Sequence, residues 1–181
     1  MRAVCLALLL LLAPAARAEQ VEGGKGTVRG PEYACSVQAP PGWVYDDESG
    51  APDGLPVVMY PAGSAWDSSP VVIYANLGRK SPNHELGDAI EAGIEKFRRA
   101  NPELVVSDAP ELITGDGRKA VVKEFRGDRH GNVERVAYID TPFLVCQVVL
   151  SARSEEAFAS SLAAFQSVVG SFAFQAGEVG P

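Results

Sequence analysis

The feature that most constrains the fold is a nearly continuous apolar run, residues 143–151, with the sequence FLVCQVVLS. A strand with one face in water alternates apolar and polar residues, whereas this run is apolar on both sides. It therefore predicts a central strand that is buried on both faces. Before it, the alternating segments 118–126 and 133–140 are separated by turn residues at 127–132, which is typical of an antiparallel hairpin.

Two segments carry the three-and-four spacing of an amphipathic helix. The first covers residues 83–99, where Ser81 and Pro82 fit an N-terminal cap followed by an early proline. The second begins after the cap residue Ser154 and ends at Gly170. Further strands are predicted at residues 33–39, 55–60, 71–77, 104–107 and 111–114, with a last short strand around Phe172 and Phe174.

The order of these elements is strands, a helix, an antiparallel meander and a second helix, which indicates an α+β protein and not a doubly wound α/β protein. A central strand buried on both faces requires cover on each side of the sheet. We therefore expect an α/β/α sandwich with a mainly antiparallel central sheet and one helix on each side. We expect a single domain over residues 31–175, preceded by a flexible glycine-rich lead-in at 19–30 and followed by a loose tail at 176–181.

The beginning of the chain has the layout of a secretory signal peptide. A positive start at Arg2 is followed by an apolar run, and Ala16 and Ala18 supply the small residues that signal peptidase requires. The run is about half of the ~20 residues needed to cross a bilayer. We therefore predict cleavage between Ala18 and Glu19, a periplasmic or secreted location, and no membrane insertion after cleavage.

The charge balance excludes some partners. The formal net charge of the chain is −7, and removal of residues 1–18 takes away Arg2 and Arg17 but no acid. The mature protein is therefore acidic, and it should repel nucleic acid and anionic lipid surfaces. Nucleic acid is accordingly not expected as a partner.

Two cysteines, Cys35 and Cys146, remain after the signal peptide has removed Cys5. An even pair in an oxidising compartment is compatible with a disulfide. Two buried free thiols are the alternative, because cysteine is also a common small core residue. Spacing along the chain does not decide between them.

No catalytic or metal-binding constellation stands out in the sequence. His84 and His130 have no cysteine or second histidine at ligand spacing, so that neither a metal nor another cofactor is predicted. Ser64 lacks the Gly-x-Ser-x-Gly context of a nucleophile elbow. Trp66 and Asp67 form the one unusual loop, because a large aromatic at the surface is either packed on the core edge or used in recognition.

Two regions carry a family resemblance. The opening strand runs into the turn Pro40-Pro41-Gly42-Trp43, and the closing strand is followed by the pattern Ser-x-x-x-Phe…Phe…Val-Val-x-Ser-Phe from Ser154 to Phe172. This pattern resembles the PsbP proteins of photosystems, the Ran-binding Mog1 proteins and exported bacterial relatives of the DUF1795/DcrB type. The resemblance implies the sandwich fold described above and a non-enzymatic role in contact with other macromolecules. It supplies no catalytic motif.

Three hypotheses for function follow. The first is an exported, non-enzymatic interaction module that contacts another envelope or secreted protein. The second is a module that binds a small ligand or a cation at a rim formed by residues 46–54, the Trp66 loop and residues 128–132. The third is a hydrolase whose carboxylates are dispersed in the sequence.

Overall fold

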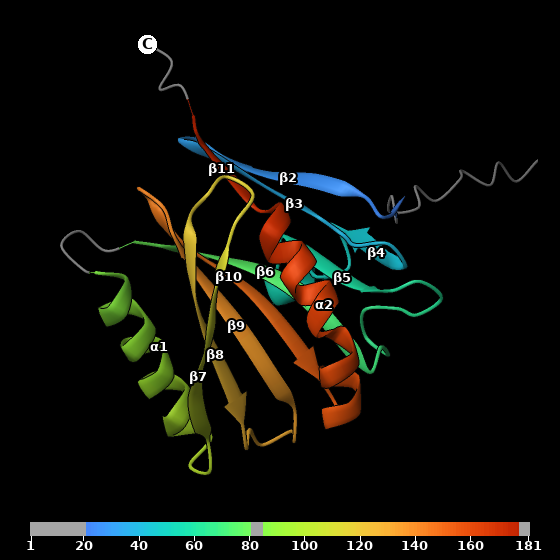
Figure 1. The fold of residues 1–181 in the computed structure, drawn as a ribbon, viewed down its shortest axis with the longest axis vertical. Helices are drawn as coiled ribbons and strands as arrows, with labels where there is room; N and C mark the ends of the chain where they lie inside the picture. The colour runs from blue at the N-terminus through green and yellow to red at the C-terminus, as the bar shows by residue number, and fades with distance from the viewer. Residues whose placement is uncertain (1–20, 81–84, 178–181) are drawn as a thin grey trace, which may run out of the picture.

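The computed structural model describes residues 21–80 and 85–177, which form two antiparallel sheets and two α-helices (Figure 1). The larger sheet has the strand order β1 (Val21–Glu22), β4 (Trp43–Asp46), β5 (Val57–Pro61), β6 (Val71–Arg79), β10 (Leu144–Ala152), β9 (Val133–Asp140), β8 (Lys119–Arg126), β7 (Val105–Ile113). The smaller sheet has the order β11 (Ala173–Ala176), β3 (Tyr33–Gln38), β2 (Lys25–Gly30). The helices are α1 (Leu86–Ala100) and α2 (Glu155–Ser171), and a 3₁₀ turn covers Ala51–Asp53.

Strand β10 confirms the prediction of a central strand. It lies between β6 and β9 and pairs antiparallel with both. Its residues Cys146, Val148 and Leu150 belong to the main core cluster, which also contains residues of α2, β3 and β11. The alternate residues Val145 and Val149 pack instead in a second cluster with residues of α1. Successive side chains of a strand point to opposite faces, so both faces of β10 are buried.

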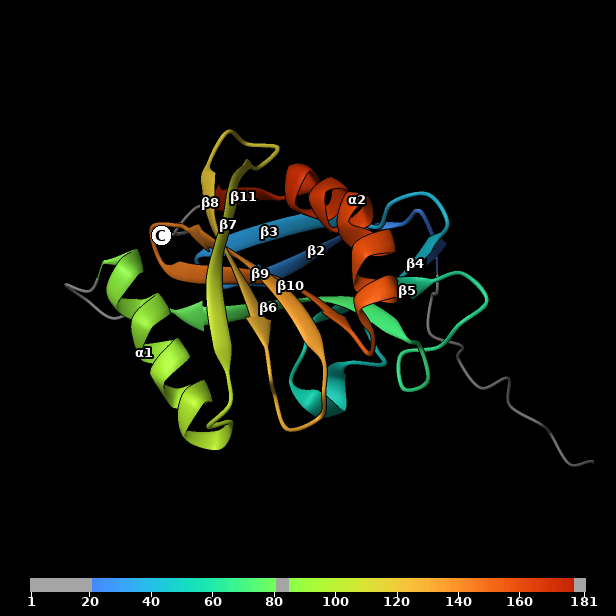
Figure 2. The ribbon, with the colours of Figure 1, turned by 60° about the horizontal axis from the view of Figure 1, so that its bottom comes forward.

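The two helices begin at different kinds of cap. Helix α2 follows Ser154, whose Oγ accepts a hydrogen bond of 3.2 Å from the backbone N–H of Ala157, as predicted. Helix α1 follows Glu85, which forms a reciprocal capping box with Asp88. The predicted cap at Ser81 and Pro82 lies outside the described residues. Helix α1 lies apart from α2 and from the smaller sheet (Figures 1 and 2).

The mixed fold class is therefore confirmed, but the architecture has two sheets where a single central sheet was expected. The expectation of a flexible lead-in at 19–30 is wrong for β1 and β2, which are paired strands. Strand β2 covers one edge of β3, and Gly26 lies so close to β4 that a Cβ there would meet the Tyr45 hydroxyl at 1.8 Å. Glycine was interpreted as a sign of mobility, whereas Gly26 permits a close approach of the two sheets.

Two other boundaries differ from the prediction. The segments 104–107 and 111–114 were predicted as separate short strands, but they form one edge strand, β7. Its pairing with β8 shifts register between Ala109 and Leu112. Pro110 lies within this irregularity. Because proline has no backbone N–H to donate to a neighbouring strand, its position was interpreted in the sequence as a break between two strands. Trp43, which was assigned to a turn, begins the buried strand β4.

No helix in the described ranges is long and apolar enough to cross a membrane. The predicted signal peptide, including Ala18 and Glu19, lies outside the described residues.

Candidate functional site: a polar pocket beside helix α1

The most distinctive cavity lies between α1 and the larger sheet. Its volume is about 220 Å³. Its apolar lining comes from both the helix and the sheet: Ile94, Phe97, Phe125, Val136 and Val149. Its polar lining consists of Tyr74, Glu134, Tyr138 and Gln147, and Gly93 completes the wall on the helix. We call this cavity the α1 pocket. It combines a mainly apolar and aromatic wall with a few polar groups, which is the usual composition of a ligand site.

Glu134 is the most unusual residue of the α1 pocket. It lies on β9, and its pairing positions set it between Phe125 of β8 and Ser151 of β10. Burial raises the pKa of the Glu134 carboxyl above its usual range, although a hydrogen bond with the Ser151 side chain opposes this effect. Among the described residues, Glu134 forms no ion pair with lysine or arginine. The pocket therefore holds a carboxyl group whose charge no protein cation neutralises directly.

Lys123 is the basic residue of β8 that lies nearest to Glu134 on the pocket face by strand register. It pairs with Val136 across β8 and β9, so it shares the face of the α1 pocket. Its Nζ lies 2.6 Å from Oδ1 of Asp108, on β7. The charge of Lys123 is therefore engaged by another carboxylate.

Two tyrosines line the α1 pocket with Glu134: Tyr138 lies on the same strand, β9, and Tyr74 lies on β6, two strands away. Burial raises the pKa of Tyr138 to about 12, and the charges of Glu134 and Glu91 add to this shift. Burial likewise raises the pKa of Tyr74, again with a contribution from Glu134. Both phenols are therefore neutral at physiological pH and can donate or accept hydrogen bonds. Their rings, together with Phe97 and Phe125, make the lining strongly aromatic.

A second cavity, the Trp66 pocket, is lined in part by Ser151, the hydrogen-bond partner of Glu134. Its volume is about 330 Å³. The residues that line it come from four connecting segments and two strands: Asp53, Trp66, Asp67, Ser69, Pro70, Val72, Asn132, Ser151 and Arg153. The three loops proposed from sequence as a rim thus contribute Asp53, Trp66 and Asn132 to one cavity. Ser151 also bonds to Glu134, so one side chain links the two pockets.

Trp66 is held in place by two contacts. Its Nε1–H donates to Oδ2 of Asp53 at 3.2 Å, and its ring meets that of Tyr74 edge to face with 6.1 Å between centroids. The backbone carbonyl of Asp67 accepts a hydrogen bond of 3.1 Å from Arg153. The packed interpretation of Trp66 therefore describes the structure, and Trp66 and Asp67 also line the Trp66 pocket.

The acidic residues proposed for a cation site are engaged locally. Asp46 is buried and accepts hydrogen bonds from the backbone N–H groups of Glu48 and Ser49 and from the hydroxyls of Ser49 and Tyr60. Burial alone would raise the pKa of Asp46, but these bonds lower it. Asp128 accepts similarly from the N–H groups of His130 and Asn132. These carboxylates close turns. Within residues 21–80 and 85–177, no group of three or more His, Cys, Asp or Glu could hold a metal ion.

The structure brings Cys35 of β3 and Cys146 of β10 together without a bond. Their Sγ atoms are 4.0 Å apart, and both thiols are free and buried. The disulfide is therefore not confirmed, and the alternative of two buried thiols describes the structure. The contact between the two sulfurs and the burial of Cys146 raise the pKa of that thiol. A thiol of this kind is a poor nucleophile.

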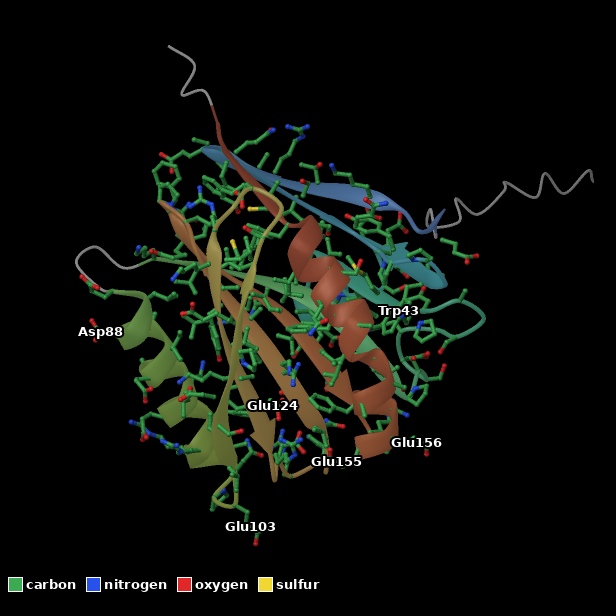
Figure 3. The ribbon with its side chains drawn as sticks, viewed as in Figure 1. Trp43, Asp88, Glu103, Glu124, Glu155 and Glu156 are labelled. Carbon is green, nitrogen blue, oxygen red and sulfur yellow. The ribbon has the colours of Figure 1, made fainter. Side chains whose placement is uncertain are left out.

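A second polar cluster lies near the beginning of α2 (Figure 3). Glu124 accepts hydrogen bonds from Arg126 and Arg135, and Arg126 also pairs with Glu155. Both guanidinium groups lie over the Phe158 ring, at 5.5 and 5.6 Å from its centroid. Burial alone would raise the pKa of Glu124, but the two arginines lower it. Every charge in this cluster has a partner, so the cluster is structural in character.

The sequence analysis did not identify Glu134, Tyr74, Tyr138 or Gln147. A signal was present, because Glu134 shares the two-residue period of Val136 and Tyr138 and therefore interrupts an apolar strand face. Tyr74 comes from β6, which is distant in the sequence, and Gln147 comes from β10, the next strand after β9. The pairing of β6, β10 and β9 brings both to the same pocket.

Comparison with known proteins identifies the fold but no family. No protein-family model matches the chain, and the search of curated proteins returns no match. Among solved structures, the chain is similar to that titled "Solution Structure of Cyanobacterial PsbP (CyanoP) from Synechocystis sp. PCC 6803". The match covers 92% of this chain and 99% of that chain, with a TM-score of 0.52 and 17% sequence identity. At this identity the likeness shows the fold alone, so the chain has a PsbP-like fold. The resemblance to DUF1795/DcrB-type proteins is not confirmed.

Proposed function

We propose that this chain is an exported, non-enzymatic binding module, and that the α1 pocket is its ligand site. The observation that carries the proposal is the Glu134 carboxyl, held in an aromatic cavity beside Tyr74, Tyr138 and Gln147 without a protein cation bonded to it. A carboxyl group that lines a cavity and pairs with a neutral hydroxyl rather than with a cation is a group that a ligand of complementary chemistry can meet. The predicted signal peptide supports export.

The non-enzymatic part of the proposal rests on the kinds of residue that meet in the pocket. Glu134, two tyrosines of raised pKa and the Gln147 amide are the polar side chains that the described residues bring to the cavity, and they include no serine, cysteine or histidine nucleophile beside a base. The sequence leads us to expect one helix on each side of the larger sheet. In that arrangement the proposed site lies on the face of the sheet that α1 covers.

A ligand screen with a pocket-blocking variant tests the proposal. Gly93 lines the α1 pocket, and a Cβ there would meet no atom within 4 Å. Gly93→Leu should therefore extend into the cavity without disturbing α1. Gly87 lies on the same helix, is equally open and does not line the pocket, so Gly87→Leu is the matched control.

The screen measures the thermal stability of the unmodified protein against metabolites and metal ions, since a ligand raises the melting temperature by mass action. We expect at least one small molecule to raise the melting temperature of the unmodified protein and of Gly87→Leu but not of Gly93→Leu. Shifts that persist in Gly93→Leu, or the absence of any shift, would contradict the assignment of this pocket.

A second candidate function is contact with another envelope or secreted protein, and the edge strand β7 favours it. Val105 and Ile113, at the two ends of β7, are 63% and 57% exposed. An extended segment of a partner could add to such an edge through main-chain hydrogen bonds. A partner that is retained by the unmodified protein and lost on Val105→Lys/Ile113→Lys would support this function. Equal capture by both proteins would argue against it.

A further inference from the structure

We infer that the α1 pocket recognises an organic cation, specifically a methylated ammonium group. The inference rests on the proposed function, because it names the class of ligand for the same pocket. It is carried by the position of Glu134 among the rings of Tyr74, Tyr138, Phe97 and Phe125.

The first argument is the balance of charge around the pocket. Glu134 is acidic, and Asp128 and Glu91 add negative potential near it and near Tyr138. The three basic residues of the neighbouring strand β8 are each paired with carboxylates: Lys119 with Glu111, Lys123 with Asp108, and Arg126 with Glu124 and Glu155. An anionic ligand would meet repulsion here, whereas a cation would supply the opposite charge that Glu134 lacks.

The second argument is the aromatic wall. A cation over the face of an aromatic ring is attracted by the negative face of the π system, and sets of such rings bind quaternary ammonium groups. Phe97 and Phe125 are already in contact, with centroids 6.0 Å apart and planes at 59°. Tyr74 is fixed by the edge-to-face contact with Trp66. The rings are therefore ordered before a ligand arrives.

The third observation is the apolar part of the pocket wall. Ile94, Phe97, Phe125, Val136 and Val149 have no hydrogen-bonding group in the side chain, so any N–H of a primary ammonium that faces them is left without an acceptor. A methylated ammonium has few or no N–H donors and places apolar methyl groups against the wall. The cavity volume of about 220 Å³ suits a small head group of this kind.

Choline and its neutral isostere 3,3-dimethylbutan-1-ol test the inference, because they differ in charge at one atom and hardly in shape. Isothermal titration of the full-length mature protein should detect choline binding and at least tenfold weaker binding of the alcohol. Glu134→Gln, which keeps the size of the side chain, should weaken choline binding at least tenfold. Glu103→Gln removes an exposed acid outside the pocket and should leave it unchanged (Figure 3).

A ring substitution gives an independent readout. Phe97→Leu keeps an apolar side chain and removes one aromatic face, so choline should bind several-fold more weakly while the alcohol is little affected. Equal binding of choline and the alcohol, or full choline affinity in Glu134→Gln, would overturn the cation assignment. No binding of either compound would overturn it too. In each case, ligands that the Gly93→Leu variant fails to bind would still support the proposed function.

Discussion

Glu134 makes the pH dependence of stability informative. Its folded-state pKa is raised by burial, so the ionised carboxylate is less favourable in the folded protein than in the unfolded chain. The cost begins as the pH rises through the unfolded value of about 4.3 and is complete above the folded value. Glu134→Gln removes this cost. We therefore expect the variant to melt higher than the unmodified protein at pH 8, and the difference to shrink toward pH 4.

Differential scanning calorimetry of the two proteins at several pH values measures this difference. The two chains are otherwise identical. The titration of Asp46, Asp116 and Glu124 therefore affects both melting temperatures equally and cancels in their difference. Those carboxyls have lowered pKa values, so their contribution to stability has the opposite sign and is lost as the pH falls. If the difference in melting temperature between the two proteins does not change with pH, ionisation of Glu134 does not destabilise the folded protein, and the prediction is wrong.

The buried thiols lead to a prediction about reactivity. Cys35 and Cys146 are 4% and 1% exposed, so an alkylating reagent should reach them only after unfolding. Mass spectrometry of a chain that starts at Glu19, and so lacks Cys5, should find no label on the native protein after brief treatment with iodoacetamide and two labels on the denatured protein. A linked Cys35–Cys146 peptide pair from protein denatured without reductant would show instead that the thiols had been oxidised to a disulfide.

Helix α2 depends on a cap that can be removed by one substitution. Ser154→Ala deletes the hydrogen bond that the Ala157 N–H donates and should reduce the free energy of unfolding by about 1 kcal/mol. Ser160→Ala, at an exposed position on the same helix, is the control, and it should change stability by less than about 0.5 kcal/mol. Urea denaturation of both variants gives the comparison. Equal effects of the two substitutions would mean that the cap is dispensable.

The elements also show what the sequence can and cannot provide. The Ser154 cap, the helical periodicities, the hairpin of β8 and β9, and the double-sided apolar pattern of β10 are local signals, and each predicted its element correctly. The cap of α1 was predicted at Ser81 and Pro82, whereas the structure has Glu85 in that position. Strands β1, β2 and β4 lacked such signals, because β1 has two residues, β2 begins and ends beside glycines, and β4 follows directly on the Pro40-Pro41-Gly42 turn. The α1 pocket could not be predicted as a unit, since Tyr74 and Gln147 join Glu134 only through strand register.

For the whole molecule, β2 is the region where sequence and structure disagree most. Its residues pair with β3 along the whole of both strands, and Val28 packs on the main core. A chain that starts at Pro31 should therefore be less stable than one that starts at Val21, with a loss of about 1 kcal/mol for each backbone hydrogen bond that is removed. Urea unfolding of the two chains measures the loss. Coincident transitions would support the original interpretation of residues 19–30 as a flexible lead-in.

The smaller sheet ties the two ends of the domain together. Strand β3 has β2 on one side, close by in the sequence, and β11 on the other, more than a hundred residues later. During synthesis, one edge of β3 therefore stays unpaired until the residues of β11 have left the ribosome. The smaller sheet is therefore completed only when β11 has been synthesised. A chain interrupted before Ala173 leaves that edge of β3 open to pairing with other strands.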